Sequence, residues 1–553
     1  TRGWLYFTKE SLDLLYPSYG DTYPTFMGAI GMTYEQAGHG RAGLGIQTDE
    51  GEVLTLKDRA IHHMTTGLST VEISSKNAEK LNLEFTKFFK NKNFKYKSYV
   101  LKNENKDKTQ RLINLLNKHE IAYEYANSGK IKGHNYATQK EETSTVSTND
   151  IVVHTNQPKG KMVKVLFEPY TKIVDSLTYD STAWSLPYAH GFNAIASKNK
   201  VNSTKKTLEN SISNTVNTSS YAYISKWNSI DDATFLAQLL KANIKVRFSE
   251  KPFIIEGKNY ERGSLIILRN DNITNKNYDT KVVEIANKQL RNLTAVGTGF
   301  VDSGKDFGSY YVKPIYKQRV AMLSGKGTSS LSFGQIWHFF ETQLKYPVTM
   351  LNSDYFGRVN FSNYDVIILP DGYYSSILNK NTLDKLKSWV KSGGTLIALK
   401  NALSSFANKD GFSLKTKKED DKAKSEKPNL TAYEDLEREN TNEIIIGAIF
   451  NSKVDTTHPL AFGYDNSYFS LKSSSKSYQY LKAGGNVAYF SKDAKNVSGF
   501  AGKNALKNVP ESLLFGEEKM GRGSIIYMVD NPLFRGFWEN GKLFFANALF
   551  MVN

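Results

Sequence analysis

The sequence contains no cysteine among its 553 residues. This absence excludes disulfide bonds, thiolate metal ligands and a cysteine nucleophile, although it does not decide the compartment. The chain also lacks an uninterrupted apolar run long enough to cross a bilayer, so no membrane span is expected. No signal peptide is recognisable at the start, where the first residue is Thr1 rather than Met.

Length and composition indicate a globular protein of several domains. With 553 residues, 40% of them hydrophobic and 23% charged, the chain exceeds what one hydrophobic core supports, and we expect three or four domains. The formal charge of +17 would permit nucleic-acid binding. The lysines behind it are scattered among Asn, Tyr, Ile and Phe along the whole chain, however. We therefore expect no nucleic-acid partner.

A loop rich in Pro, Gly and Tyr near the start leads into a short apolar stretch that carries a carboxylate. The loop reads Tyr16-Pro-Ser-Tyr-Gly-Asp-Thr-Tyr-Pro24, and the stretch reads Gly28-Ala-Ile-Gly-Met-Thr-Tyr-Glu-Gln-Ala-Gly38. We interpret the stretch as a strand with Glu35 at its end. An unpaired carboxylate is costly to bury, whereas active sites place catalytic groups at rigid strand ends. Glu35 is therefore a candidate catalytic residue.

These residues resemble the last part of the catalytic domain in zinc carboxypeptidases of the carboxypeptidase A family, in the large multidomain form of Bacteroidetes-type bacteria. In that family the Glu of a Thr-aromatic-Glu strand is the general base that takes a proton from zinc-bound water. The resemblance implies that Glu35 is this base. It also implies that Tyr16, with Tyr19 as its rival, is the loop tyrosine that covers the substrate, a peptide or protein.

The same resemblance implies parts that the given sequence does not hold. In the family, the zinc-binding His-x-x-Glu, a second His and the Arg that binds the substrate's carboxylate all belong upstream. We therefore expect zinc as a cofactor without ligands in this chain, residues 1–94 as the C-terminal portion of a peptidase domain, and a missing N-terminal half as partner. The chain alone should be inactive. Export to the periplasm, the outer-membrane surface or the extracellular space is implied as well.

Two features close to Glu35 have other interpretations. Gly38-His-Gly-Arg-Ala-Gly43 has the spacing G-x-G-x-x-G, but a dinucleotide site needs a helix at these glycines, and residues 44–51 read as strand and turn. A Gly-rich loop is the better interpretation. His39 is a weak candidate zinc ligand, because the family takes its ligands from elsewhere.

A helix is expected to follow, packed on the sheet of the peptidase domain. Thr55 and Asp58 resemble a capping pair, and apolar residues continue at helical spacing, namely Leu56, Ala60, Met64, Leu68 and Val71. His62 and His63 are adjacent and therefore cannot chelate one metal together as an i, i+4 pair could.

Residues 95–200 and 201–316 show a repeated strand–helix–strand pattern. We interpret it as the internal duplication of a small α/β module, with a solvated Ser/Asn/Thr-rich linker over 198–220. Between the copies, Asp175, Asp180 and Trp184 either bind a ligand or pack at the module junction, and packing is the favoured interpretation.

The third unit, residues 317–553, has the clearest fold signal. Continuously apolar strands, including Tyr364-Asp-Val-Ile-Ile-Leu-Pro-Asp-Gly372, alternate with helices and predict a parallel sheet covered on both faces. The order resembles the class I glutamine-amidotransferase-like, flavodoxin-like fold. Members that work as enzymes carry a Cys on a strained turn, which here reads Lys400-Asn401-Ala402. Ser404 or Ser405 could replace it only beside a His and an acid, so a non-catalytic scaffold or binding module is favoured.

Three further segments of this unit have patterns that invite a functional interpretation. Ser324-Gly-Lys-Gly-Thr-Ser329 lacks the spacing of a phosphate loop. Residues 415–429 are highly charged and predict a mobile surface loop. Arg535, within an aromatic run before a closing amphipathic helix, either binds a ligand or caps nearby carbonyls as a buried structural arginine, and the structural role is the favoured interpretation.

The fold class expected overall is α/β, with an incomplete peptidase domain, duplicated modules and an amidotransferase-like domain. The first functional hypothesis is a metallocarboxypeptidase-family protein seen without its zinc-binding half. The alternative is a non-catalytic binding or assembly protein of the bacterial cell envelope, built on a peptidase-derived scaffold and acting on an envelope partner.

Overall fold

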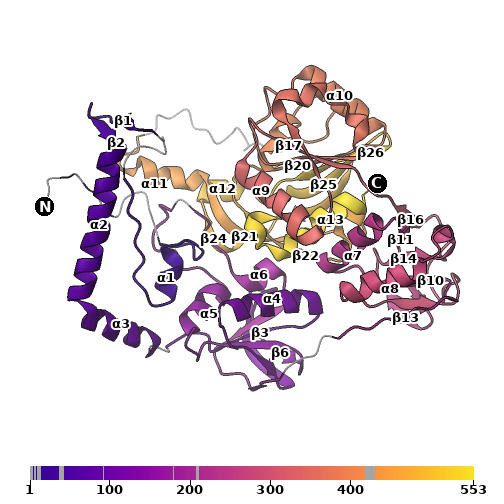
Figure 1. Ribbon diagram of the computed structural model, residues 1–553, viewed down its shortest axis with the longest axis horizontal. Helices are drawn as coiled ribbons and strands as arrows, with labels where there is room; N and C mark the ends of the chain where they lie inside the picture. The colour runs from indigo at the N-terminus through magenta and orange to yellow at the C-terminus, as the bar shows by residue number, and fades with distance from the viewer. Residues whose placement is uncertain are drawn as a thin grey trace.

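The computed structural model describes residues 4, 6, 8, 14–36, 43–90, 93–178, 180–206, 211–417 and 430–552. Over these residues the protein is a mixed α/β protein with five sheets, one of which combines parallel and antiparallel strands. In Figure 1 the N-terminal helices stand along one side, the first module lies at the bottom, the second at the right and the C-terminal domain at the top. No helix among the described residues is long and apolar enough to cross a membrane.

The N-terminal segment contains short elements and two helices that bury none of their residues. Its elements are α1 (Thr22–Phe26), β1 (Gly45–Gln47), β2 (Val53–Thr55), α2 (Leu56–Lys76) and α3 (Ala78–Lys90). The helix expected after Thr55 is confirmed together with its capping box: Thr55 Oγ1 accepts from Asp58 N at 3.1 Å, and Asp58 Oδ2 accepts from Thr55 N at 3.2 Å.

Two expectations for this segment are wrong. Residues 30–36 form no strand, so Glu35 lies on irregular backbone. The helix α2 does not pack on a sheet: it has no buried residue, and β1 and β2 pair with each other as a two-stranded antiparallel ribbon. Such a ribbon offers too little apolar surface to cover a helix of 21 residues.

The first module is an antiparallel seven-stranded sheet with helices on it. Its strand order is β6-β5-β8-β3-β7-β4-β9. The strands are β3 (Ser98–Leu101), β4 (Glu124–Ala126), β5 (Gly129–Asn135), β6 (Lys140–Val146), β7 (Ile151–His154), β8 (Ala194–Ser197) and β9 (Ser203–Thr204), and the helices are α4 (Lys106–Lys118), α5 (Gly160–Phe167) and α6 (Leu186–His190).

The second module has a five-stranded antiparallel sheet in the order β15-β10-β14-β11-β16 and a separate hairpin. The sheet strands are β10 (Ala222–Ser225), β11 (Val246–Ser249), β14 (Leu265–Leu268), β15 (Thr294–Val296) and β16 (Val312–Ile315). The hairpin strands are β12 (Phe253–Ile255) and β13 (Lys258–Tyr260), and the helices are α7 (Ile230–Lys241) and α8 (Tyr278–Lys288).

The two modules have the same topology. Taken along the chain, β3, α4, β4, the β5–β6 hairpin, β7, α5 and β8 correspond to β10, α7, β11, the β12–β13 hairpin, β14, α8 and β15. In both modules the first strand pairs antiparallel with the strand that follows the hairpin. In the first module β3 pairs with β7, from Ser98 opposite His154 to Leu101 opposite Ile151. In the second module β10 pairs with β14, from Ala222 opposite Leu268 to Ser225 opposite Leu265. The difference lies in the hairpin, since β5 joins the main sheet through β8 whereas β12 and β13 pair with each other.

The C-terminal domain contains a ten-stranded sheet whose first five strands, in the order β18-β17-β19-β20-β26, are parallel. They are β17 (Val320–Ser324), β18 (Thr349–Asn352), β19 (Val366–Leu369), β20 (Thr395–Leu399) and β26 (Gly523–Met528). The antiparallel extension consists of β21 (Ile445–Val454), β22 (Ser467–Lys472), β23 (Gly485–Phe490), β24 (Asn496–Ala501) and β25 (Ser512–Met520). The parallel strands and helices predicted for this unit are confirmed.

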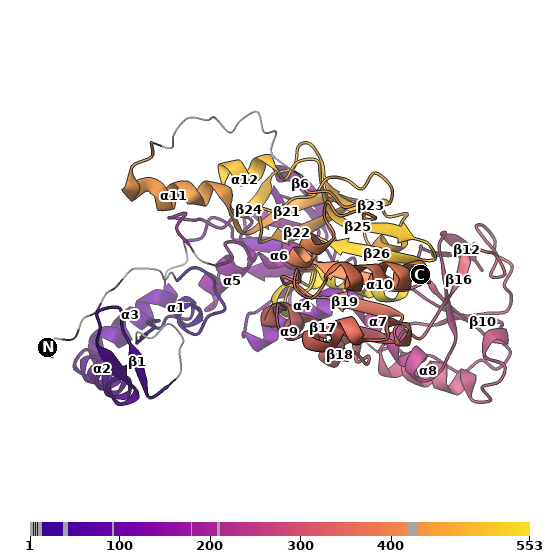
Figure 2. The same ribbon diagram turned by 90° about the horizontal axis from the view of Figure 1, so that it is seen from above.

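Helices cover both faces of the parallel strands, which explains why those strands are apolar throughout. Val366 and Ile368 of β19 belong to the core that contains α9 and α13, whereas Ile367 and Leu369 belong to the core that contains α10. The covering helices are α9 (Ser330–His338), continued as a π-helix over Phe339–Leu344, α10 (Lys380–Lys391) and α13 (Lys542–Phe550), and the domain also contains α11 (Leu436–Asn440) and α12 (Lys503–Lys507). Figure 2 shows the same arrangement from above.

The closing helix α13 is not amphipathic, contrary to the sequence-based expectation. Every one of its nine residues is buried. Its side chains belong to a continuous core that also includes residues of both modules, such as Leu112 and Leu236. A helix that is enclosed on all sides has no solvent face to keep polar. Of the charged loop expected at 415–429, residues 418–429 lie outside those that the structure describes.

A buried arginine joins the two modules. Arg291, which follows α8 and is 8% exposed, donates two hydrogen bonds to Asp107 of α4, at 2.5 and 2.6 Å, and one to Asp232 of α7 at 2.9 Å. Ser229 Oγ also donates to Asp107 at 2.6 Å. The guanidinium therefore neutralises a carboxylate from each module in a site with little water.

Replacing Arg291 by alanine should destabilise the protein by about 3–5 kcal/mol, because it leaves two buried carboxylates without their cation. Urea unfolding followed by circular dichroism measures the loss. Arg319→Ala is the matched control, since Arg319 pairs with Asp365 at 2.7 Å on the surface, with side chains 58% and 36% exposed. That change should cost about 1 kcal/mol or less. Equal losses in the two variants would contradict a structural role for the buried pair.

Candidate functional site

Five side chains that the sequence analysis singled out meet in one cluster. We call it the Arg535 cluster, and it consists of Tyr16, Tyr19, Asp180, Trp184 and Arg535. The Tyr16 ring is buried, with the Arg535 guanidinium 4.5 Å from its centroid and the Trp184 ring edge-on at 5.8 Å. The Tyr16 and Tyr19 rings lie 5.6 Å apart. The cluster thus joins the N-terminal segment, the first module and the C-terminal domain.

The centre of the cluster is an ion pair between Arg535 and Asp180. Arg535 Nη2 donates to Asp180 Oδ1 at 2.6 Å and Nη1 donates to Oδ2 at 3.1 Å, while the Tyr19 hydroxyl donates to the same carboxylate. Arg535 adopts φ 48°, in the left-handed region that non-glycine residues seldom occupy. Its partner is a carboxylate, so the expectation that it caps carbonyls is wrong.

The electrostatics of the cluster follow from this pairing. Burial by itself would raise the pKa of Asp180, but the hydrogen bonds from Arg535 and Tyr19 outweigh burial and hold that pKa below its ordinary value. Burial and the hydrogen bond to Asp180 raise the pKa of Tyr19 to about 12. Burial also raises the pKa of Tyr16. Both tyrosines therefore stay protonated at neutral pH.

Glu35 does not join the Arg535 cluster, and its neighbours in the chain contact α2 instead. Its side chain is exposed and forms no hydrogen bond or ion pair within the described part of the chain. The residues on either side of it bind α2: the Tyr34 hydroxyl lies 2.9 Å from Thr70 Oγ1, and Gln36 Oε1 lies 2.7 Å from His62 Nδ1. The structure therefore brings Tyr16 and Tyr19 together with Arg535 and places Glu35 beside α2.

The chain does not supply a zinc site in its described residues. No group of three or more His, Asp or Glu side chains there is close enough to hold a metal ion. His62 is engaged with Gln36, and His39 lies outside the described residues. The described side chains therefore do not supply the donor set that the implied zinc would need. Asp175, which the sequence analysis named with Asp180 as a possible ligand-binding residue, pairs with Arg438 at 2.8 Å on the surface.

A strained turn follows β20, at the position where the amidotransferase resemblance implies a Cys that this chain does not have. Lys400 has φ 49°, a conformation that costs of order 1 kcal/mol or more for a side chain with a Cβ and often marks functional sites. Its Nζ donates to Ser473 Oγ at 3.0 Å and lies 3.5 Å from Asp371 Oδ2. The backbone N–H of Asn401 donates to Asp371 Oδ1 at 3.1 Å. The carboxylate of Asp371 therefore fills the space beside this turn.

Neither Ser404 nor Ser405 has the partners of a nucleophile. Ser404 Oγ donates to the Asn401 carbonyl at 2.7 Å, and the residues that line the cleft beside Ser405 include no His. Within the described residues of this domain, His458 is bound to Glu517 at 2.8 Å instead. Neither serine is therefore placed beside a His and an acid in the described residues, and the non-catalytic interpretation of this domain stays a prediction.

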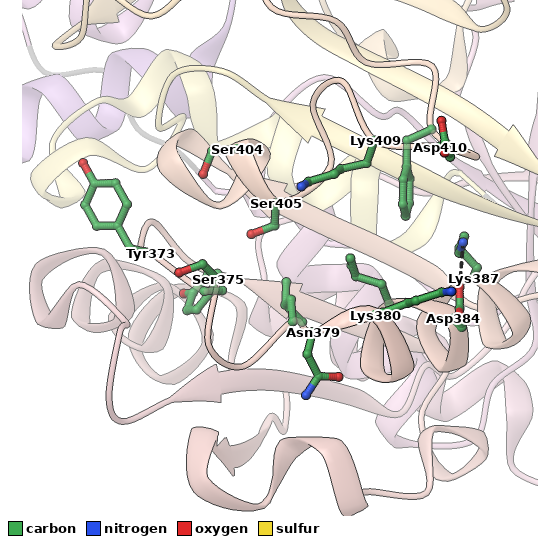
Figure 3. Close-up of a pocket in the computed structure, with 14 residues that line it drawn as sticks. Tyr373, Ser375, Asn379, Lys380, Asp384, Lys387, Ser404, Ser405, Lys409 and Asp410 are labelled. Atoms are coloured by element: carbon green, nitrogen blue, oxygen red, sulfur yellow. Dashed lines mark ion pairs between the residues drawn. The ribbon is translucent and has the colours of Figure 1, made fainter.

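A cleft of about 540 Å³ lies next to this turn, between the start of α10 and residues 404–412 (Figure 3). Lysine, serine and aromatic side chains line it. The sequence analysis missed this cleft, because Lys409 and Asp410 stand in a loop without a motif. Only the position of a loop at the carboxyl end of a parallel strand could have pointed to it.

Comparisons with solved structures find a likeness over part of the chain. No family model and no curated protein matches the chain. Among solved structures, it is similar to a ThuA-like protein from Bacteroides uniformis (13% identity, 42% of this chain, 89% of that chain, TM-score 0.26). It is also similar to a GMP synthase subunit from Thermoplasma acidophilum (10% identity, 42% of this chain, 92% of that chain, TM-score 0.27). A third similar structure is a glutamine amidotransferase from Thermotoga maritima (7% identity, 39% of this chain, 76% of that chain, TM-score 0.24).

Part of the chain thus resembles class I glutamine-amidotransferase-like and ThuA-like proteins. With TM-scores below 0.5, these likenesses say nothing about which residues of this chain act on a ligand. None of the three proteins is a carboxypeptidase, so that part of the resemblance stays a prediction.

Replacing Arg535 by alanine should loosen the N-terminal segment. Amide hydrogen exchange over residues 14–27 should accelerate about tenfold, which corresponds to a loss of ~1.4 kcal/mol in the free energy of local opening. The Tyr23–His119 contact of 2.8 Å would remain as a second attachment of this segment. Arg438→Ala is the control, because its pair with Asp175 is exposed and should leave exchange unchanged. Unchanged exchange in Arg535→Ala would contradict an anchoring role.

The attachment of residues 14–27 through Asp180 should weaken as the pH falls. Because the folded-state pKa of Asp180 is lowered, its contribution to stability is complete above the ordinary Asp pKa and is lost as the pH falls through the lower folded value. Exchange over residues 14–27 should therefore accelerate in acid in the wild type, after correction for intrinsic rates, and less so in Asp180→Asn.

Proposed function

We propose that this chain is part of a hydrolase of the zinc carboxypeptidase type, in which Glu35 acts as general base and the remaining domains form a platform for the segment that carries it. The observation that carries the proposal is the state of Glu35: exposed and without a hydrogen bond or ion pair in the described part of the chain, on a segment whose flanking residues are bound to α2. A carboxylate held by its neighbours but not itself engaged is available for proton transfer.

The role assigned to Glu35 is limited to proton transfer. In peptide hydrolysis the carboxylate accepts a proton from the attacking water as the new C–O bond forms. It then delivers that proton to the amine nitrogen as the C–N bond breaks. Metal ligands and the group that binds the substrate's carboxylate would come from polypeptide outside these 553 residues.

The surface of α2 supports the proposal that further polypeptide packs here. Leu56, Met64, Leu68 and Val71 lie on one stripe of the helix, spaced by eight, four and three residues, and each is more than half exposed. A contiguous apolar stripe of this kind usually marks an interaction surface. In the proposed domain it would be covered by the sheet that the resemblance places next to this helix.

The tyrosines receive a different role from the one that the resemblance implies. Tyr16 is buried against Arg535 and Trp184, and the Tyr19 hydroxyl is bound to Asp180. We propose that they anchor the segment to the platform. For Tyr16 to cover a substrate, it would first have to leave the Arg535 cluster.

The alternative is a binding or assembly protein of the cell envelope without peptidase activity. The filled turn at Lys400, which has no nucleophile, favours it for the C-terminal domain. We propose that this domain is non-catalytic under either function, so the two differ in the role of Glu35 and of the polypeptide that packs on α2.

The chain alone should release no C-terminal residue from a peptide in the presence of zinc. The natural polypeptide that contains it should do so, with a free but not an amidated C-terminus as substrate. There, Glu35→Gln should lower kcat by about 10³-fold or more, while Glu52→Gln, an exposed acid between β1 and β2, should leave it unchanged. Chromatographic detection of the released amino acid measures both.

Each part of the proposal can fail separately. Turnover by the chain alone would refute the account of the metal ligands. Full activity of Glu35→Gln in the natural polypeptide would refute the role of Glu35. The absence of a His-x-x-Glu motif from that polypeptide would leave the binding protein as the function.

A further inference from the structure

The cleft of the C-terminal domain lies where ligands bind in open parallel sheets. Residues 373–375 follow β19 and residues 404–412 follow β20, so both segments leave the carboxyl ends of neighbouring parallel strands. Ligands of such sheets bind outside these ends. The volume of about 540 Å³ is within the range of small-molecule sites, roughly 300–1,000 Å³.

The cleft combines an apolar floor with a polar rim. Leu378 and Phe412 are buried at its base, and Tyr373 presents an aromatic ring that is 65% exposed. Ser375 and Ser405 contribute hydroxyl groups to the rim. In Figure 3 the side chain of Lys409 extends across the cleft toward Ser405, and Tyr373 stands at the far end.

Two lysines of the lining, Lys380 and Lys409, form no ion pair with any residue that the structure describes. Asp384 pairs with Lys387 at 2.8 Å along α10. The ammonium group of Lys409 forms no hydrogen bond or ion pair with any residue that the structure describes, although it reaches over the cleft. The lining contains the cations Lys380, Lys387 and Lys409 against the anions Asp384 and Asp410. A ligand with a negative group would therefore meet an uncompensated positive charge.

We propose that this cleft binds a carboxylate-bearing ligand about as large as a disaccharide or dipeptide. Lys409 pairs with the carboxylate, the Ser405 hydroxyl donates a hydrogen bond to it, and the body of the ligand lies on Leu378 and Phe412 beside the Tyr373 ring. A charge-assisted hydrogen bond is stronger than a neutral one, which sets the preference for an anion. This site is independent of Glu35 and of the proposed peptidase activity.

The neighbouring turn at Lys400 supports the choice of a carboxylate without being the site itself. There the protein already holds a carboxylate, that of Asp371, between a lysine Nζ at 3.5 Å and a backbone N–H at 3.1 Å. Since Asp371 fills that position, a ligand would bind on the open side, at Lys409 and Ser405.

Isothermal titration of the 553-residue chain tests the proposal with two carboxylates and their neutral counterparts. The probes are glucuronate against glucose and a Gly-Phe dipeptide against its C-terminal amide. At least one carboxylate should bind at least tenfold more tightly than its neutral counterpart. Binding of glucuronate alone identifies an acidic sugar as the source of the carboxylate, and binding of the dipeptide alone identifies a peptide terminus.

Variants of the rim assign the interaction. Lys409→Met, which keeps the length but removes the charge, should weaken carboxylate binding at least tenfold, and Ser405→Ala should weaken it severalfold. Lys415→Met is the matched control, because Lys415 is exposed in the following segment and does not line the cleft. The proposal is overturned if both carboxylates fail to bind, if they bind no better than the neutral probes, or if Lys409→Met and Lys415→Met bind alike.

Discussion

The burial of α13 on all sides is the constraint on which the arrangement of the domains depends. This helix contributes to a core that runs through both modules and the C-terminal sheet. Its one amide, Asn547, accepts from Trp227 of the second module at 2.8 Å and donates to the Leu460 and Phe462 carbonyls at 2.9 and 2.8 Å. Lys542, 1% exposed, pairs with Glu539. Because the Trp227 bond to Asn547 forms only when the second module is docked, separating that module would expose apolar area and break a buried hydrogen bond at once.

Two arginines at the junctions illustrate how burial decides what an ion pair does. Arg291 is enclosed between the modules, where its two carboxylates make it part of the permanent structure. Arg535 is 31% exposed in its side chain and holds a segment that otherwise buries little. A partly exposed pair contributes less to stability than an enclosed one. The attachment of the N-terminal segment is thus weaker than the junction between the modules, which suits a segment whose α2 surface is proposed to bind further polypeptide.

The strained turn of the C-terminal domain is occupied by one of the protein's own carboxylates. Lys400 has a left-handed backbone, and its ammonium group and the next N–H both contact Asp371. What remains open is the cleft beside it, where Lys409 is uncompensated within the described residues. This open cleft is where we propose that a carboxylate-bearing ligand binds.

The sequence by itself determined the elements whose causes are local. The capping box of α2, the strand β20 and the alternation of strands and helices in the C-terminal domain follow from hydrogen bonds and apolar periodicity within a few residues. It marked Tyr16, Asp180 and Arg535 as unusual without joining them. Only the tertiary structure decided that the three meet, Asp180 and Arg535 across 355 residues, that residues 30–36 form no strand and that α13 has no polar face. These outcomes depend on which surfaces pack against which, and packing between distant segments leaves no periodic trace in the chain.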